Sequence, residues 1–133
     1  MTGNKLQADP PLISILIPVR DDLPNLQTCL RSLTREINRE GIEVLVCDDG
    51  SAVPLEETSL QEIIRGIRVF RIRGGGPARA RNYLAEKAGG EYLFFVDADT
   101  EFSGNTLTTA RRIIRENPDL QAFIGSYDDS PGT

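Results

Sequence analysis

The fold is decided by the stretch Tyr92-Leu93-Phe94-Phe95-Val96-Asp97-Ala98-Asp99, an apolar run that ends in two carboxylates one residue apart. A short run this apolar predicts a strand that is buried on both faces of a sheet. In open α/β sheets, ligands bind at the carboxyl ends of the strands. Carboxylates at that place are oxygen ligands for a hard divalent cation, which can in turn carry a diphosphate. The alternative is an acidic turn in which one Asp caps the next helix, and the spacing alone does not separate the two.

Strand-like and helix-like segments alternate along the rest of the chain. Such alternation predicts an α/β fold, with a Rossmann-like open and mainly parallel sheet of about five strands and helices on both faces. We expect a flexible leader over residues 1–11, one domain over 12–126, and a tail over 127–133. The expected strands are residues 12–19, 42–47, 67–72, 91–96 and 122–125, with the third nearer an edge, and the expected helices are 23–41, 59–65, 78–88 and 105–116.

Acidic residues follow three of these strands, as Asp21-Asp22, Asp48-Asp49 and Asp97-Ala98-Asp99. The third strand is followed instead by Arg73 and three glycines. Because the carboxyl ends of parallel strands meet at one edge of a sheet, the acids and the glycine loop are expected to gather there. Three acidic groups on one predicted edge favour a functional site over chance placement of acids in loops.

The bulk composition excludes several classes of function. A net charge of -5 gives no support to nucleic-acid binding, which favours a basic face. No apolar run approaches the roughly 18 residues of a membrane-spanning helix, so we expect a cytoplasmic protein without membrane contact. The sequence has no His, which removes imidazole bases and His-ligated metals. Cys29 and Cys47 fit small buried apolar residues in a reducing compartment.

Four blocks of the sequence, in order, resemble the nucleotide-sugar-binding N-terminal half of the family 2 glycosyltransferases, which have the GT-A fold. The resemblance covers about residues 12–125, and each block alone is weak, whereas four in order form a strong signal. The blocks are Ile15 to Asp21, Val46 to Ser51 with its Asp-Asp-Gly-Ser, Gly74 to Asn82 with its Gly-Gly-Pro and Ala-Arg-Asn, and Gly90 to Asp99 with its Asp-x-Asp motif.

The resemblance implies a pocket for the base of a nucleotide. Asp48 would accept a hydrogen bond from the imide of a uracil-like base, since a carboxylate is an acceptor-only group. Pro18 and Arg20 would line that pocket. Arg20-Asp21 stands where the commoner family form has Tyr-Asn, so a stacking Tyr is absent beside the base.

The resemblance also implies a site for the donor diphosphate. Asp97 would bind the ribose hydroxyls or a metal-bound water, and Asp99 would ligate a divalent cation, Mn²⁺ or Mg²⁺. The cation would stabilise the nucleoside diphosphate as it leaves. Arg81 would lie near the phosphates, although a salt bridge from Arg81 to Asp97 or Asp48 that merely shapes this edge is an equal alternative.

The implied reaction is an inverting transfer of a sugar, of the hexosyltransferase class, from a nucleotide-diphospho-sugar to an unknown acceptor. A UDP-sugar is favoured over a GDP-sugar as the donor. In this family the acceptor site and the catalytic base lie in a second half, so no catalytic base is assigned and the chain alone is expected to transfer poorly. Strand edges left bare by a missing half favour a homodimer.

Two other readings compete with a transferase. A non-catalytic module that keeps the nucleotide-sugar pocket would have the same sequence features. A receiver-type phosphoacceptor domain also has an acid pair after one strand and an Asp after a later one. That class needs a lysine after a later strand, and none occurs after Lys87.

Overall fold

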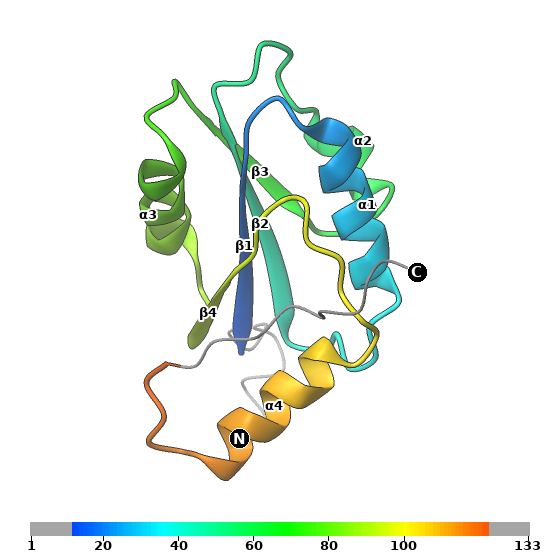
Figure 1. Cartoon of the computed structure of the whole chain (residues 1–133), viewed down its shortest axis with the longest axis vertical. Coiled ribbons are helices and arrows are strands. Elements are labelled where there is room, and N and C mark those ends of the chain that lie inside the picture. The colour runs from blue at the N-terminus through cyan, green and yellow to red at the C-terminus, as the bar shows by residue number, and fades with distance from the viewer. Residues whose placement is uncertain (1–11, 123–133) are drawn as a thin grey trace, which may run out of the picture.

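A computed structural model describes residues 12–122 of the chain. Four strands and four helices alternate along it (Figure 1). They are β1 (Ile13–Val19), α1 (Leu23–Thr34), β2 (Ile42–Asp49), α2 (Glu57–Gln61), β3 (Arg68–Ile72), α3 (Pro77–Lys87), β4 (Tyr92–Phe95) and α4 (Thr106–Glu116).

The strands form one parallel sheet in the order β3-β2-β1-β4. Helix α3 lies on one face of this sheet, and α1 and α2 lie on the other (Figure 1). Two apolar clusters fill the space between the layers: a small one with Leu16, Leu45 and Leu84 under α3, and a larger one under α1, α2 and α4. The predicted Rossmann-like α/β fold with helices on both faces is confirmed.

The two central strands are apolar because both of their faces are covered. In β1, Ile13, Ile15, Leu16 and Ile17 are at most 1% exposed. The predicted edge position of the third strand is correct, since β3 ends the order on one side. These strands carry the acidic loops of one edge at fixed spacing, because β1 pairs with β2 from Ile13 to Val19 without a break.

The prediction that residues 91–96 are buried on both faces is wrong. Among residues 12–122, strand β4 is the other edge of the sheet, and its residues alternate between half-buried and exposed. Leu93 is 42% exposed and Phe95 is 46% exposed, because no helix within residues 12–122 covers that face of β4. The apolar run is therefore half-covered in the part of the chain that the structure describes.

The first helix is shorter than the leucine spacing predicts. It ends at Thr34 rather than near Gly41, and Ile37 is 65% exposed. The amides of Arg35 and Glu36 bond to carbonyls three residues back, and Asn38 has a left-handed φ of 64°. This tight turn ends the helix and directs the Glu36 side chain inward.

Two further boundaries differ or fall outside the described residues. Helix α2 is a single short turn from Glu57 to Gln61, earlier than the predicted 59–65. Ala122 is not in a strand, and the rest of the predicted fifth strand lies outside residues 12–122, as do the predicted leader and tail. No helix among the described residues is both long and apolar enough to cross a membrane.

Candidate functional site

A polar hollow of about 310 Å³ lies at the carboxyl ends of β1, β2 and β4. It contains four carboxylates from three different loops, together with two arginines, so the structure brings the predicted acidic groups to one edge of the sheet. The residues that line it are Pro18, Val19, Arg20, Asp22, Asp49, Pro77, Arg81, Asp97, Ala98 and Asp99. Five of the six predicted site residues are among them, and Asp48 is not.

Asp48 is buried beneath the hollow and its carboxylate is already bonded. The amides of Ser51 and Leu55 donate to it at 2.9 and 3.0 Å, and Arg71 Nη1 lies 2.7 Å from Oδ2. Burial alone would raise the pKa of Asp48, but the bonds from Leu55, Ser51 and Arg71 outweigh it and lower that pKa. Asp48 thus holds the loop after β2 in place, and its predicted role in base binding stays a prediction.

Asp49, the next residue, faces the hollow instead. It is 4% exposed, and its Oδ1 has no hydrogen-bond partner among residues 12–122. A buried carboxylate oxygen without a donor costs free energy, so this oxygen is suited to accept a hydrogen bond from a ligand or a water. Sequence reasoning chose Asp48 and missed Asp49.

The alternation of side chains along β2 separates the two acids. Leu45 and Cys47 pack against the α3 face of the sheet, whereas Val44 and Val46 pack against the α1 face. Since side chains alternate along a strand, Asp49 belongs to the α3 face and Asp48 to the other. The hollow is lined by Pro77 and Arg81 of α3, so only Asp49 is on its side.

The glycine loop before α3 packs closely against the loop after β2. Gly74, Gly75 and Gly76 have φ values of 99°, 132° and 94°, which residues other than glycine rarely adopt. A Cβ on Gly50 would lie 3.1 Å from the Gly74 amide nitrogen and 3.2 Å from the Arg73 carbonyl carbon. The glycines therefore allow the two loops that border the hollow to touch.

The loop after β1 is fixed to the loop after β2. Asp21 has a left-handed φ of 50°, a conformation that Asp and Asn tolerate best among residues with a side chain. Its amide donates to Ser51 Oγ at 2.8 Å, and its Oδ1 accepts from the Ala52 amide at 2.7 Å. These bonds place the neighbouring Arg20 and Asp22 at the hollow.

Arg81 reaches from α3 to Asp97. Its Nη2 lies 3.3 Å from Asp97 Oδ1, and both side chains are about half exposed. The structure therefore contains the salt bridge between Arg81 and Asp97 that the sequence left open as an alternative. An exposed pair of this kind contributes little to stability, so both groups remain available to a ligand.

The hollow suits a cation only when a ligand supplies part of the coordination. Within residues 12–122, no three Asp, Glu, Cys or His side chains form a ready-made metal cage. Asp97 and Asp99 are exposed and line the hollow together. Mg²⁺ and similar cations are commonly held by one or two carboxylates plus phosphate oxygens, and this donor set fits that arrangement.

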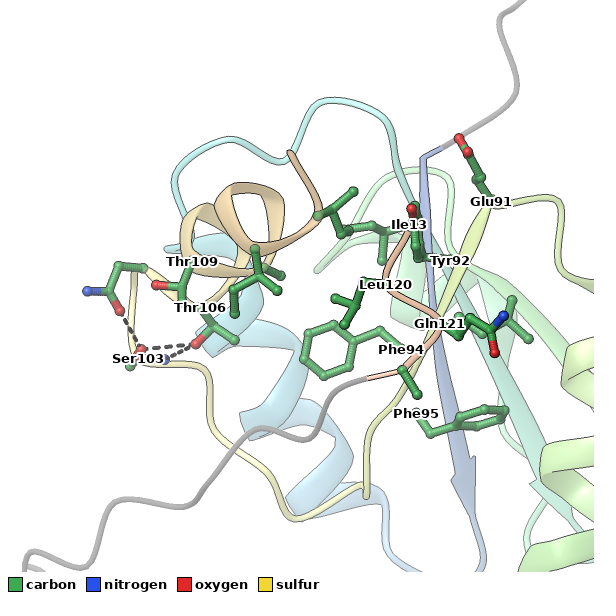
Figure 2. A pocket seen from close by; sticks show the side chains of 16 residues that line it. Ile13, Glu91, Tyr92, Phe94, Phe95, Ser103, Thr106, Thr109, Leu120 and Gln121 are labelled. Atoms are coloured by element: carbon green, nitrogen blue, oxygen red, sulfur yellow. Dashed lines mark hydrogen bonds between the residues drawn. The ribbon is translucent and has the colours of Figure 1, made fainter. Parts of the chain in front are cut away.

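A second, larger hollow of about 1130 Å³ runs between β4 and α4 (Figure 2). Its walls are mostly apolar, and in Figure 2 Phe94, Phe95 and Leu120 lie along it. It follows the edge of β4, since residues from both faces of that strand line it, and its lining contains no cluster of titratable side chains. Within residues 12–122 the larger hollow is therefore a mostly apolar surface, and the smaller one has the charged groups.

Comparison with known proteins decides the family. The sequence profile described as Glycosyl transferase family 2 matches residues 14–133. The chain belongs to glycosyltransferase family 2. The domain is 29% identical to the glycosyltransferase GlyG of Streptococcus pneumoniae over 127 residues, which are 91% of this chain and 42% of GlyG. It is 33% identical to an uncharacterized glycosyltransferase of Haemophilus influenzae over 80% of this chain and 44% of that protein.

Solved structures agree with this assignment. Residues 1–349 of Staphylococcus aureus TarS, named a poly(ribitol-phosphate) β-N-acetylglucosaminyltransferase, match with a TM-score of 0.72 and 27% identity over 80% of this chain and 33% of that one. The same protein was solved with UDP-GlcNAc. A mannosyltransferase of Pyrobaculum calidifontis, solved with GDP-Man and Mn²⁺, has a TM-score of 0.68 at 20% identity, which shows the fold alone. The domain spans less than half the length of these relatives.

Proposed function

We propose that the family 2 domain binds a nucleotide-diphospho-sugar, with a UDP-sugar favoured, and presents it for inverting transfer to an acceptor. The observation that carries this proposal is the buried Oδ1 of Asp49, which lacks a donor among the described residues and lines the same hollow as Asp97 and Asp99. A nucleotide supplies both a hydrogen-bond donor for that oxygen and a diphosphate for a cation. TarS, at 27% identity, was solved with UDP-GlcNAc, which supports this class of donor.

The base is proposed to bind at Asp49 rather than at Asp48. The imide N–H of uracil would donate to Asp49 Oδ1, a charge-assisted hydrogen bond in a site with little water. Pro18 and Arg20 line the same hollow and would border the base. Asp48 is proposed to act indirectly, because its bonds to Ser51 and Leu55 fix the loop that follows Asp49.

The diphosphate is proposed to bind between Asp97, Asp99 and Arg81. Asp99 and Asp97 would hold a divalent cation, Mn²⁺ or Mg²⁺, together with phosphate oxygens. When bound, the cation supplies Lewis-acid stabilisation of the charge on the departing diphosphate. Arg81 is already 3.3 Å from Asp97, and its planar fork can turn from that carboxylate to a phosphate.

Transfer itself needs more than these groups. No residue of the hollow is assigned as the base that deprotonates the acceptor, and the domain spans less than half of its relatives. Because no such base is assigned among the described residues, a second candidate is a module that binds the donor without transferring the sugar. Hydrolysis of a UDP-sugar by the chain separates the two, since only a transferring site releases free sugar and UDP. The acceptor, the homodimer and a cytoplasmic location stay predictions of the sequence.

Calorimetric titration tests the proposal. UDP, GDP and their sugars are titrated into the chain with and without Mn²⁺, and then into Asp99→Ala. We expect Mn²⁺ to tighten UDP binding, and we expect Asp99→Ala to remove most of that gain without changing the melting temperature. Binding that is the same with and without Mn²⁺, and in both proteins, would remove Asp99 from the metal role.

A further inference from the structure

The segment that follows the Asp97-Ala98-Asp99 motif is tied to the end of α1. Ser32 is fully buried in the last turn of α1, and its Oγ accepts a hydrogen bond from the Phe102 amide at 2.8 Å. The hydroxyl itself donates to the Cys29 carbonyl at 2.7 Å. Ser32 therefore joins the helix to the loop through one buried group.

Glu36 makes a second and stronger connection. It is 5% exposed, and its two carboxylate oxygens accept from different amides, Oε2 from Gly104 and Oε1 from Leu107 at 2.7 Å. The N-cap residue of α4, Asn105, makes no side-chain capping bond of its own. Glu36 thus caps α4 from the turn that follows α1, and a negative charge is favoured at the N-terminus of a helix.

These bonds fix the downstream end of the acidic turn. Upstream, the Val96 amide donates to the Leu16 carbonyl of β1 at 3.0 Å, so the strand side of the turn is held by the sheet. Downstream, the first backbone bond to another element is the one from Phe102 to Ser32. Only residues 97–101 lie between the two fixed points, and Asp97 and Asp99 are both among them.

We infer that Glu36 and Ser32 are positioning residues for metal binding by Asp97 and Asp99, an inference that rests on the proposed function. The two carboxylates are exposed, and Asp99 receives no hydrogen bond from its neighbours among the described residues. Asp97 pairs with Arg81, whereas Asp99 is positioned by the backbone of the five-residue turn, and that backbone is fixed at its downstream end by Ser32 and Glu36. Carboxylates held at the right spacing bind a cation without the cost of ordering the turn first.

Glu36→Gln tests this inference, with Glu43→Gln as the matched control. Glu43 lies at the opposite end of the sheet, where its Oε2 accepts from Ser14 Oγ and from the Gly89 amide at 2.6 Å. In both variants an amide replaces a carboxylate that accepts two hydrogen bonds from other segments, so both are expected to lower the melting temperature. The readout is the ratio of UDP dissociation constants without and with Mn²⁺, which is measured on folded protein only.

We expect Glu36→Gln to reduce the Mn²⁺ gain in UDP affinity by about tenfold, because the turn must then be ordered on binding, with metal-free UDP binding unchanged. Glu43→Gln is expected to keep the wild-type gain. Should Glu36→Gln not fold, Ser32→Ala tests the same anchor, with a smaller loss of the gain expected. Equal Mn²⁺ gains in UDP affinity in the Glu36, Ser32 and Glu43 variants would overturn this inference but not the proposed metal site. A wild-type chain with no Mn²⁺ gain would overturn the proposed metal site as well.

Discussion

The carboxyl end of the sheet and the β4 edge are both hollowed, but their surfaces are built differently. At the carboxyl end, four carboxylates and two arginines surround about 310 Å³, and the loops behind them are joined by backbone and side-chain bonds. At the β4 edge, about 1130 Å³ is lined mostly by apolar surface, with Phe94 and Leu120 near one another, and also by polar side chains such as Thr106 (Figure 2).

This difference shows that size does not identify a functional site. The larger hollow runs along a sheet edge that no other strand among residues 12–122 covers, and it has mostly apolar walls. The smaller hollow contains charged side chains whose positions are held by hydrogen bonds among three loops. Four experiments test this difference between the two hollows.

The largest effect is expected from Asp48→Ala, beneath the polar hollow. The change leaves the amides of Ser51 and Leu55 and the guanidinium of Arg71 without their acceptor. Removing one partner of such a buried group costs about 3 kcal/mol of unfolding free energy. Urea unfolding measures the loss, and a variant as stable as wild type would show that Asp48 does not support this loop.

A smaller effect, on binding rather than stability, is expected from Asp49→Asn. The neutral amide replaces the carboxylate that is proposed to accept from the base, so UDP affinity should fall about thirtyfold, or about 2 kcal/mol. The melting temperature should not fall, because Oδ1 has no partner to lose within residues 12–122. Calorimetry with UDP measures the loss, and Asp48→Asn is the comparison variant. A larger loss of UDP affinity in Asp48→Asn than in Asp49→Asn would return the base-binding role to Asp48.

A third effect appears in acid. The pKa of Asp48 is lowered in the folded state, since its hydrogen bonds outweigh burial, whereas an unfolded Asp titrates near about 3.9. The stability that Asp48 contributes is therefore present above about pH 4 and is lost as the pH falls through the lower folded value. Urea unfolding between pH 7 and pH 3 should show wild type losing more stability than Asp48→Asn. Parallel curves for the two proteins would contradict the lowered pKa.

The smallest effect on stability is expected at the β4 edge. Leu93 is 42% exposed, so Leu93→Lys should change the unfolding free energy by less than about 0.5 kcal/mol and leave UDP binding unchanged. A charge on an edge strand opposes pairing between chains, so the predicted homodimer should weaken in this variant. Sedimentation at several concentrations measures this, and an unchanged dimer would place the contact elsewhere.

Much of the fold followed from local patterns in the sequence. The apolar strands and the acids behind them predicted the parallel sheet and the shared edge, because strand ends of a parallel sheet must meet there. The choice between Asp48 and Asp49 was also available, since the apolar partners Cys47 and Leu45 share the α3 face with Asp49. The sequence pattern does not indicate which face of the sheet has the hollow.

Other features depend on contacts between distant residues. Arg71 lies opposite Asp48 in the strand register, which no spacing along the chain indicates. Helix α1 ends early, and Glu36 beyond its end caps α4 by accepting from the Leu107 amide, 71 residues away in the sequence. The composition of β4 is that of a covered strand, and only the sheet order reveals that it is an edge.

The most direct measurement is an amide chemical-shift map of the chain titrated with UDP and Mg²⁺. The proposed site predicts shifts concentrated in residues 18–22, 48–52, 74–81 and 97–104, with the amides of Phe94, Phe95 and Thr109 along the apolar hollow unchanged. Shifts that follow β4 and α4 instead, or no shifts at saturating UDP and Mg²⁺, would contradict a donor site at the carboxyl end of the sheet.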